Sequence, residues 1–280
     1  MSNMNYLENF LAVKELEGCS TATIKNYKFN LSKFLLWADA APTEITTQQI
    51  RKYLADYKRE RGVSNCTLDN MRRVYSSFFH WMHQEGYVLK DPCAAINKIK
   101  TDKIIKSPFS DEEMEILRDN CKNVRETAIV EILYSSGMRI GELAGLNRDD
   151  INWQNGCAIV FGKGSKEREV YFTVRSQMAL KKYLDTRHDD SPALFVGLMS
   201  PHKRLQISTY EKILRELGNR CDIHCHPHRF RRTCATTLLN KGMPIQEVSK
   251  VLGHAKLETT LIYCEINQKQ VAADHKKYMS

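Results

Sequence analysis

Two segments near the middle of the chain carry a cation in a setting suited to a phosphate group. Arg139 comes just after a break at Gly137, and Glu142 stands three residues further on, where its carboxylate could hold the guanidinium in place. Lys163 lies between Gly162 and Gly164, which allow a ligand to approach the backbone closely. Taken alone, the first pattern also fits a surface ion pair and the second an exposed turn lysine, and neither has the spacing of a nucleotide-binding loop.

Two further segments supply donors, a second arginine and a nucleophile. His228 and Arg231 are three residues apart at the start of a predicted helix, so both could face one anion near its positive end. His254 follows Gly253 at the end of another predicted helix, and Tyr263 comes nine residues later. Alone, His254 fits a helix cap and Tyr263 a buried structural tyrosine. Together the segments match the needs of phosphodiester transfer without a metal.

A cluster of potential zinc ligands precedes His228. Its spacings fit neither a regular zinc finger nor a helical histidine pair, which favours ordinary loop residues over a metal site. The cluster consists of Cys221, His224, Cys225 and His226.

The elements that must position these residues are mainly helical. Apolar stripes predict about four helices before residue 98, the clearest of which begins behind Ser20. The later part is mostly helical as well, with one predicted β-hairpin formed by Ala158–Phe161 and Glu169–Phe172 around a glycine-rich turn. Further helices are predicted over Ser176–Asp185, Thr209–Leu217, Arg229–Asn240 and Ile245–Leu252.

A lysine-rich stretch without helical periodicity separates the two parts. We interpret 99–106 as a basic linker between a helical domain, 1–98, and a second domain, 107–280. Ser110 followed by Glu113 is typical of a capping box and indicates that a new helix begins there.

The charge balance favours a polyanionic partner. Lys and Arg number 42 against 33 Asp and Glu, a net charge of +9, which fits nucleic acid or an acidic membrane surface. The chain has no apolar run long enough to span a bilayer and no signal-peptide pattern, so a cytoplasmic protein is expected. The nine cysteines include no C-x-x-C pair, which indicates reduced thiols.

The ordered motifs R-x-G-E-L, G-K-G, H-x-x-R and L-G-H, followed after nine residues by Tyr, resemble those of the tyrosine recombinases, the phage integrase family. The spacings are similar to those of Xer-type and transposon integrases, and the resemblance covers nearly the whole chain. It implies a core-binding domain before the linker and a catalytic domain, mixed α/β with a small antiparallel sheet, after it. The six active-site positions would be Arg139, Lys163, His228, Arg231, His254 and Tyr263. Arg232 departs from the family, many of whose members have His there.

The resemblance implies a reaction. Tyr263 would attack the scissile phosphate to give a 3′-phosphotyrosine and a free 5′-hydroxyl, with Lys163 protonating the leaving oxygen and His228 acting as base or orienting group. Arg139 and Arg231 would clamp the phosphate oxygens, assisted by His254. No ATP, metal or other cofactor would be needed.

The resemblance also implies partners: double-stranded DNA with specific recombination sites, a homotetramer that exchanges strands through a Holliday junction, and possible accessory excision or architectural proteins. The last residues, Asn267–Ser280, are similar to the tails of mobile-element integrases. Gln270–Ser280 is expected to dock as a short helix on a neighbouring protomer, and the alternative is that it folds back on its own catalytic domain. Two alternatives stay open, a catalytically silent DNA-binding regulator on the same fold and a type IB topoisomerase.

Overall fold

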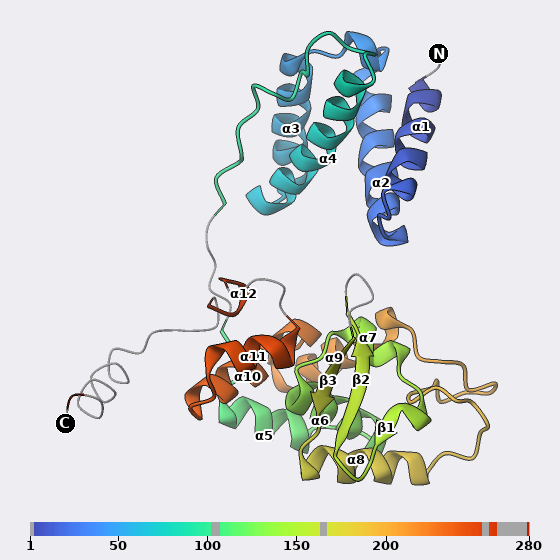
Figure 1. Ribbon diagram of the computed structural model, residues 1–280, viewed down its shortest axis with the longest axis vertical. Helices are drawn as coiled ribbons and strands as arrows, with labels where there is room; N and C mark the ends of the chain where they lie inside the picture. The colour runs from blue at the N-terminus through green and yellow to red at the C-terminus, as the bar shows by residue number, and fades with distance from the viewer. Residues whose placement is uncertain (1–2, 102–106, 163–166, 254–257, 262–278, 280) are drawn as a thin grey trace. The chain divides into compact units, whose positions relative to one another are not determined.

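The computed structural model describes residues 3–101, 107–162, 167–253, 258–261 and 279 (Figure 1). The chain divides into two compact units, Met1–Ile104 and Ile105–Ser280, each with its own hydrophobic core. The division falls within the stretch interpreted as a linker. Each unit is described by itself below.

Four helices form the first unit, as the apolar stripes predict. Ser20 begins the second helix by accepting the backbone N–H of Thr23 at 3.2 Å, so the start predicted from the sequence is confirmed. The helices are α1 (Asn3–Leu16), α2 (Thr21–Ala38), α3 (Thr47–Arg61) and α4 (Asn65–Gln84), with a short 3-10 helix η1 (Pro42–Glu44) between α2 and α3.

Buried aromatic side chains dominate the core of this unit. The rings of Phe34 and Tyr75 have centroids 4.7 Å apart, and those of Phe10 and Phe78 are 5.3 Å apart with planes at 88°. Edge-to-face and tilted pairs of this kind add to the stability that burial itself provides. The stripes on α2 and α4 therefore meet as one core.

The chain stays attached to α4 after the last predicted helix. The carboxylate of Asp69, only 3% exposed, accepts the backbone N–H of Ile99 at 3.1 Å, and Asn65 donates to the carbonyl of Lys100 at 2.8 Å. A hydrogen bond from Arg72 holds the pKa of Asp69 below its usual range, against burial, which raises it. Ile99 and Lys100, the first residues of the stretch interpreted as a linker, are thus hydrogen-bonded to α4.

The second unit contains the remaining elements. Ser110 and Glu113 make both halves of the predicted capping box at the start of its first helix. The helices are α5 (Asp111–Asp119), α6 (Val124–Ser136), α7 (Ile140–Gly145), η2 (Arg148–Asp150, 3-10), α8 (Val174–Asp185), α9 (Ile207–Cys221), α10 (Pro227–Asn240), α11 (Ile245–Leu252) and α12 (Glu258–Leu261).

A small antiparallel sheet completes the second unit. Its order is β1 (Ile151–Asn152), β2 (Cys157–Phe161) and β3 (Glu167–Tyr171), and Ile159 pairs with Glu169 in the centre of the hairpin. The predicted hairpin is confirmed, although β3 begins two residues earlier than expected and β1 is an additional strand. The earlier start brings Arg168 into the sheet, beside the buried Val170 in the alternating pattern of the strand.

Helix α6 lies at the centre of this unit and packs against α8, α10 and β3 (Figure 1). Apolar residues such as Ile129 and Leu133 are fully buried on it, and so is Glu131. Its central position fixes where the chain emerges at Gly137, two residues before Arg139. Within the described residues, none of the helices is long and apolar enough to cross a membrane.

Candidate active site

The turn that presents Arg139 begins at the end of α6. Gly137 ends the helix in the left-handed conformation, with φ of 57°, and its N–H donates to the carbonyl of Leu133 at 3.1 Å. A Cβ at this position would lie 2.8 Å from Cδ2 of Leu252 and 3.1 Å from Sγ of Cys234, so glycine is required for both the turn and the packing. Arg139 follows as the extended N-cap residue of α7.

Glu142 holds Arg139 through two bonds. Its Oε1 accepts from Nη1 of Arg139 at 3.0 Å, and its Oε2 accepts the backbone N–H of the same residue at 2.7 Å. The predicted contact is therefore confirmed. The pair joins a buried carboxylate to a partly exposed guanidinium, because the Glu142 side chain is only 5% exposed and that of Arg139 is 37% exposed.

Arg168 is a second partner of Glu142 that the motifs do not reveal. Its Nη1 and Nη2 donate to the two carboxylate oxygens at 2.6 and 2.7 Å, in a two-pronged geometry. Burial raises the pKa of Glu142, but the bonds from Arg168 and from the Arg139 backbone hold it below its ordinary value. Glu142 is therefore an anion between two guanidinium groups.

Arg231 reaches the same region from α10. Its side chain is buried, with the residue 3% exposed, and donates from Nη1 to the carbonyl of Gly137 at 2.8 Å and from Nη2 to that of Leu252 at 2.5 Å. His228 lies on the first turn of the same helix and is exposed. The two residues share one helix, as predicted, but differ in burial.

The three arginines meet at the end of α11. Nε of Arg168 donates to the carbonyl of Val251 at 3.0 Å, and Nη2 of Arg139 to that of Gly253 at 3.3 Å. With the bond from Arg231 to Leu252, three successive carbonyls are satisfied by guanidinium groups. The last carbonyls of a helix have no partners within it and carry partial negative charge, so cations are favoured there. We call Arg139, Arg168 and Arg231 with Glu142 the arginine cluster.

Three predicted site residues lie outside the described part of the chain. They are Lys163, Tyr263 and His254, the last of which directly follows Gly253 in the sequence. The predicted docking tail, Gln270–Ser280, is likewise not described apart from Met279. Arg232, at the position where the family often has His, donates from Nη1 to the carbonyl of Ser107 at 3.2 Å.

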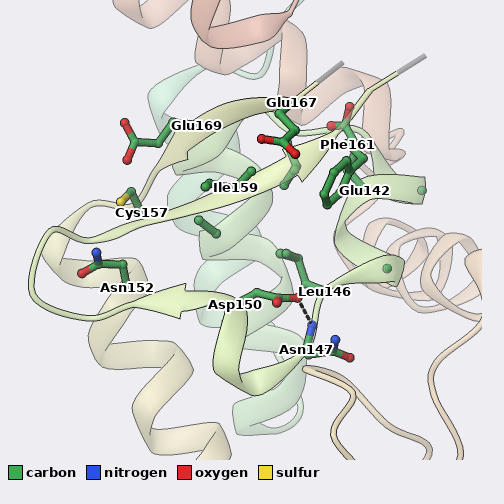
Figure 2. Close-up of a pocket in the computed structure, with 14 residues that line it drawn as sticks. Glu142, Leu146, Asn147, Asp150, Asn152, Cys157, Ile159, Phe161, Glu167 and Glu169 are labelled. Atoms are coloured by element: carbon green, nitrogen blue, oxygen red, sulfur yellow. Dashed lines mark hydrogen bonds between the residues drawn. The ribbon is translucent and has the colours of Figure 1, made fainter. Parts of the chain in front are cut away.

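The arginine cluster carries a net positive charge around Glu142, since this one carboxylate lies between the guanidinium groups of Arg139 and Arg168. It therefore suits a phosphate. Glu142 also borders a cavity of about 710 Å³, which none of the three arginines lines (Figure 2). The carboxylates of Asp150, Glu167 and Glu169 line that cavity, so it would repel a polyanion.

The cysteine and histidine cluster shows no convergence on a metal. Cys225 is buried, and burial raises the pKa of its thiol to about 12, whereas His224 is exposed. Among all the residues that the structure describes, no group of three or more His, Cys, Asp and Glu is placed to hold a metal ion.

Comparison with known families decides which proteins this chain belongs with. The model of the phage integrase family matches residues 108–270, and that of the family's N-terminal SAM-like domain matches residues 6–87. The chain belongs to the phage integrase family. The resemblance stated from the motifs is thus confirmed, and so is the predicted combination of a helical domain with a mostly helical one that contains a small sheet.

Individual relatives in this family are Xer tyrosine recombinases. The tyrosine recombinase XerA of Pyrococcus horikoshii is 31% identical over 273 residues, covering 96% of this chain and 92% of the relative. The tyrosine recombinase XerC of Thermodesulfovibrio yellowstonii is 30% identical, with 95% and 93% covered.

Solved structures agree in fold. A crystal structure of XerA recombinase has 28% identity and a TM-score of 0.56, covering 100% of this chain and 99% of the other. The Tn1549 transposon integrase in complex with a circular intermediate DNA has 16% identity and a TM-score of 0.78, with 99% of each chain covered. XerH bound to its palindromic difH substrate after cleavage has 20% identity and a TM-score of 0.74, covering 95% and 83%. The last two similarities show the fold alone.

Proposed function

We propose that this protein is a site-specific DNA recombinase that cleaves and rejoins DNA through a covalent 3′-phosphotyrosine at Tyr263. The observation that carries the proposal is the meeting of Arg139 and Arg231, from two different helices, at the end of α11. Helix α11 ends at Leu252, two residues before His254. Residues of three separate motifs, R-x-G-E-L, H-x-x-R and L-G-H, are thereby linked in one region of the second unit.

The arginines would stabilise charge on the phosphate. Arg139, whose side chain is 37% exposed, remains accessible to a ligand while Glu142 fixes its direction. Arg231 adds a second positive charge from within the protein. As the tyrosine oxygen bonds to phosphorus, negative charge grows on the non-bridging oxygens, and cations already in place stabilise it without reorganisation. We propose that these cations do the work for which many nucleases use a divalent metal.

Proton transfer would be divided between two residues. The Tyr263 oxygen forms a bond to phosphorus and loses its proton, with His228 as base or orienting group. The bond from phosphorus to the 5′ oxygen breaks, and Lys163 gives that oxygen a proton, so the products are a 3′-phosphotyrosine and a 5′-hydroxyl. The reverse attack by a 5′-hydroxyl rejoins the strand, and no ATP is consumed because the ester bond is exchanged rather than hydrolysed.

Double-stranded DNA with a specific site is the proposed substrate. The net charge of +9 fits such a partner, and structures of proteins with a similar fold contain bound DNA. We propose that 1–98 is a core-binding domain, 99–106 a basic linker and 107–280 the catalytic domain. Four protomers on two sites would exchange strands, with Gln270–Ser280 docking on a neighbour and with accessory excision or architectural proteins as further partners.

Tyr263→Phe tests the proposal directly. On a nicked suicide substrate, the wild-type protein should form a covalent adduct that denaturing electrophoresis resolves, whereas the variant should form none. DNA affinity should stay nearly unchanged, since phosphate contacts elsewhere carry the binding. Adduct formation by the variant would contradict the assignment of the nucleophile.

The wild-type assay also separates the proposed function from its alternatives. A protein that binds DNA but never forms an adduct would be a silent regulator. Relaxation of a supercoiled plasmid without a recombination site, with no strand exchange between two sites, would identify a topoisomerase instead.

A further inference from the structure

Arg168 contacts both Glu142, which holds Arg139, and the last turn of α11, which leads to His254. On one side its two terminal nitrogens hold the carboxylate of Glu142, which in turn holds Arg139. On the other side its Nε donates to the carbonyl of Val251 in the last turn of α11. A Cβ at Gly253 would come 2.7 Å from Cδ of Arg168, so the arginine lies directly against the residue that precedes His254.

Arg168 also affects how much of the positive charge of Arg139 the carboxylate of Glu142 neutralises. Its nitrogens lie 2.6 and 2.7 Å from the Glu142 oxygens, closer than Nη1 of Arg139 at 3.0 Å. The Arg168 side chain is 10% exposed and that of Glu142 is 5% exposed, so water screens this pair little. Without Arg168, the buried carboxylate would have Arg139 as its remaining guanidinium partner, and those two would form a neutral pair. With Arg168 present, Arg139 keeps its charge for a phosphate.

We propose that Arg168 is a positioning residue for strand cleavage, which neutralises Glu142 so that Arg139 stays cationic and correctly directed toward the scissile phosphate. This inference rests on the proposed function, because it assigns Arg139 to the phosphate. Arg168 acts through Glu142 and does not itself contact DNA, in keeping with its burial and its protein partners. Its loss therefore affects the rate of cleavage more than the binding of DNA.

The chain offers a matched control in Arg118. This arginine, 12% exposed, donates to the buried Glu131 at 2.7 and 3.2 Å, in a pair of similar geometry and burial. The bonds of Arg118 within the described residues go to Glu131 and Glu115, and its guanidinium lies over the ring of Tyr134, none of which is a proposed active-site residue. Comparing Arg168→Met with Arg118→Met thus separates a specific effect on cleavage from a general loss of stability.

Single-turnover cleavage of the nicked suicide substrate is the measurement. Arg168→Met should lower the maximal rate about 10²-fold, because misdirecting a catalytic group by roughly 1 Å costs that much, while the Kd for DNA and its salt dependence stay near wild type. Arg118→Met should lower the melting temperature and leave the rate unchanged. In the Glu142→Gln background, adding Arg168→Met should slow cleavage by about tenfold at most, because no negative charge is left to neutralise.

The inference is wrong if Arg168→Met cleaves at the wild-type rate, or if Arg118→Met slows cleavage as much as Arg168→Met does. It is also wrong if Arg168→Met weakens the salt dependence of DNA binding without changing the cleavage rate. The same 10²-fold loss from Arg168→Met in the wild-type and Glu142→Gln backgrounds would overturn it as well. If Arg168→Met does not fold, the cleavage rates of Glu142→Gln and of the double variant Glu142→Gln/Arg168→Met decide whether the inference holds. The double variant removes both charges of the pair, so neither is left buried without a partner. A wild-type protein that forms no adduct at all would instead overturn the proposed function, and the inference with it.

Discussion

Two buried glutamates of the second unit each hold a pair of arginines, but the two groups differ in charge balance. Glu131 pairs with Arg118 at 2.7 Å and Arg175 at 3.1 Å, and Glu115 supplies a second carboxylate to the same arginines. Two cations there face two anions. Glu142 also pairs with two arginines, Arg139 and Arg168, so two cations there face one carboxylate. The third arginine of the cluster, Arg231, donates to the backbone carbonyls of Gly137 and Leu252.

The difference separates structural charge from charge available to a ligand. At Glu131 every formal charge has a counterpart, and the group joins α5, α6 and α8. At Glu142 two guanidinium groups share one carboxylate, and the carbonyls of Val251 and Gly253 orient these groups without cancelling their charge. A buried ion pair whose charges cancel is weak evidence for a ligand-binding site. Oriented cations that outnumber their carboxylate partners favour the binding of an anion.

The largest expected effect concerns the partly exposed arginine of each group. Arg139→Ala should slow adduct formation about 10²–10³-fold, as the loss of one preorganised donor to a transition state typically does. Arg175→Ala, which removes the 58% exposed partner of Glu131, should leave the rate unchanged. Single-turnover kinetics on the suicide substrate measure both. Similar rates for the two variants would remove the distinction between the groups.

Unlike the rate of adduct formation, the free energy of unfolding should depend on the group around Glu131. Glu131→Ala leaves Arg118 partly buried without its main partner, so the free energy of unfolding should fall by about 3 kcal/mol. Urea denaturation followed by circular dichroism gives this value. Glu115→Ala is the control, because this carboxylate is 57% exposed and its loss should cost about 1 kcal/mol or less. Equal losses in the two variants would count against a structural role for Glu131.

A smaller effect should appear in the pH dependence of stability. Burial raises the pKa of Glu142, but its bonds with Arg168 and Arg139 hold it below the ordinary value. A carboxyl with a depressed pKa in the folded state stabilises the protein above its unfolded pKa of about 4.3 and loses this effect as the pH falls through the folded pKa. The stability difference between wild type and Glu142→Gln should therefore narrow as the pH falls below about 4. A constant difference in urea titrations across this range would refute the linkage.

The smallest expected effect is that of a chelator. If the arginine cluster supplies the positive charge that the phosphate needs, adduct formation should proceed at the same rate with and without EDTA after dialysis against a chelating resin. Loss of activity that Mg²⁺ restores would show that the arginines are insufficient.

Local signals predicted much of the fold. The cap at Ser20 and the capping box at Ser110 each fix a helix start through side chains adjacent to it, so sequence alone locates them. Helix α6 also has a side-chain cap, at Asn123, but it is buried on nearly all sides and lacks an amphipathic stripe, so its apolar pattern does not mark it as a helix. The strand β1 is only two residues long, too short to show alternation.

The candidate site was predictable where function depends on short motifs. The contact between Arg139 and Glu142 follows from their spacing of three residues. Arg168 lies 26 residues from Glu142 along the chain, so no local pattern pairs them. One signal was present, since Arg168 stands two residues before Val170 and so on the buried face of the same strand. A charged residue there needs a buried partner, but sequence does not reveal which one.

Hydrogen bonds anchor the chain on either side of the division between the two units. They limit the length of the segment that connects the units. Asn65 holds the carbonyl of Lys100, and Arg232 holds that of Ser107. Whatever path the intervening residues take, seven Cα–Cα steps span at most about 25 Å. Short tethers of this kind give effective concentrations in the millimolar range. On the proposed function, a duplex bound by one unit meets the other at such a concentration, so each can bind weakly, release in turn and still give the whole chain high avidity for its site.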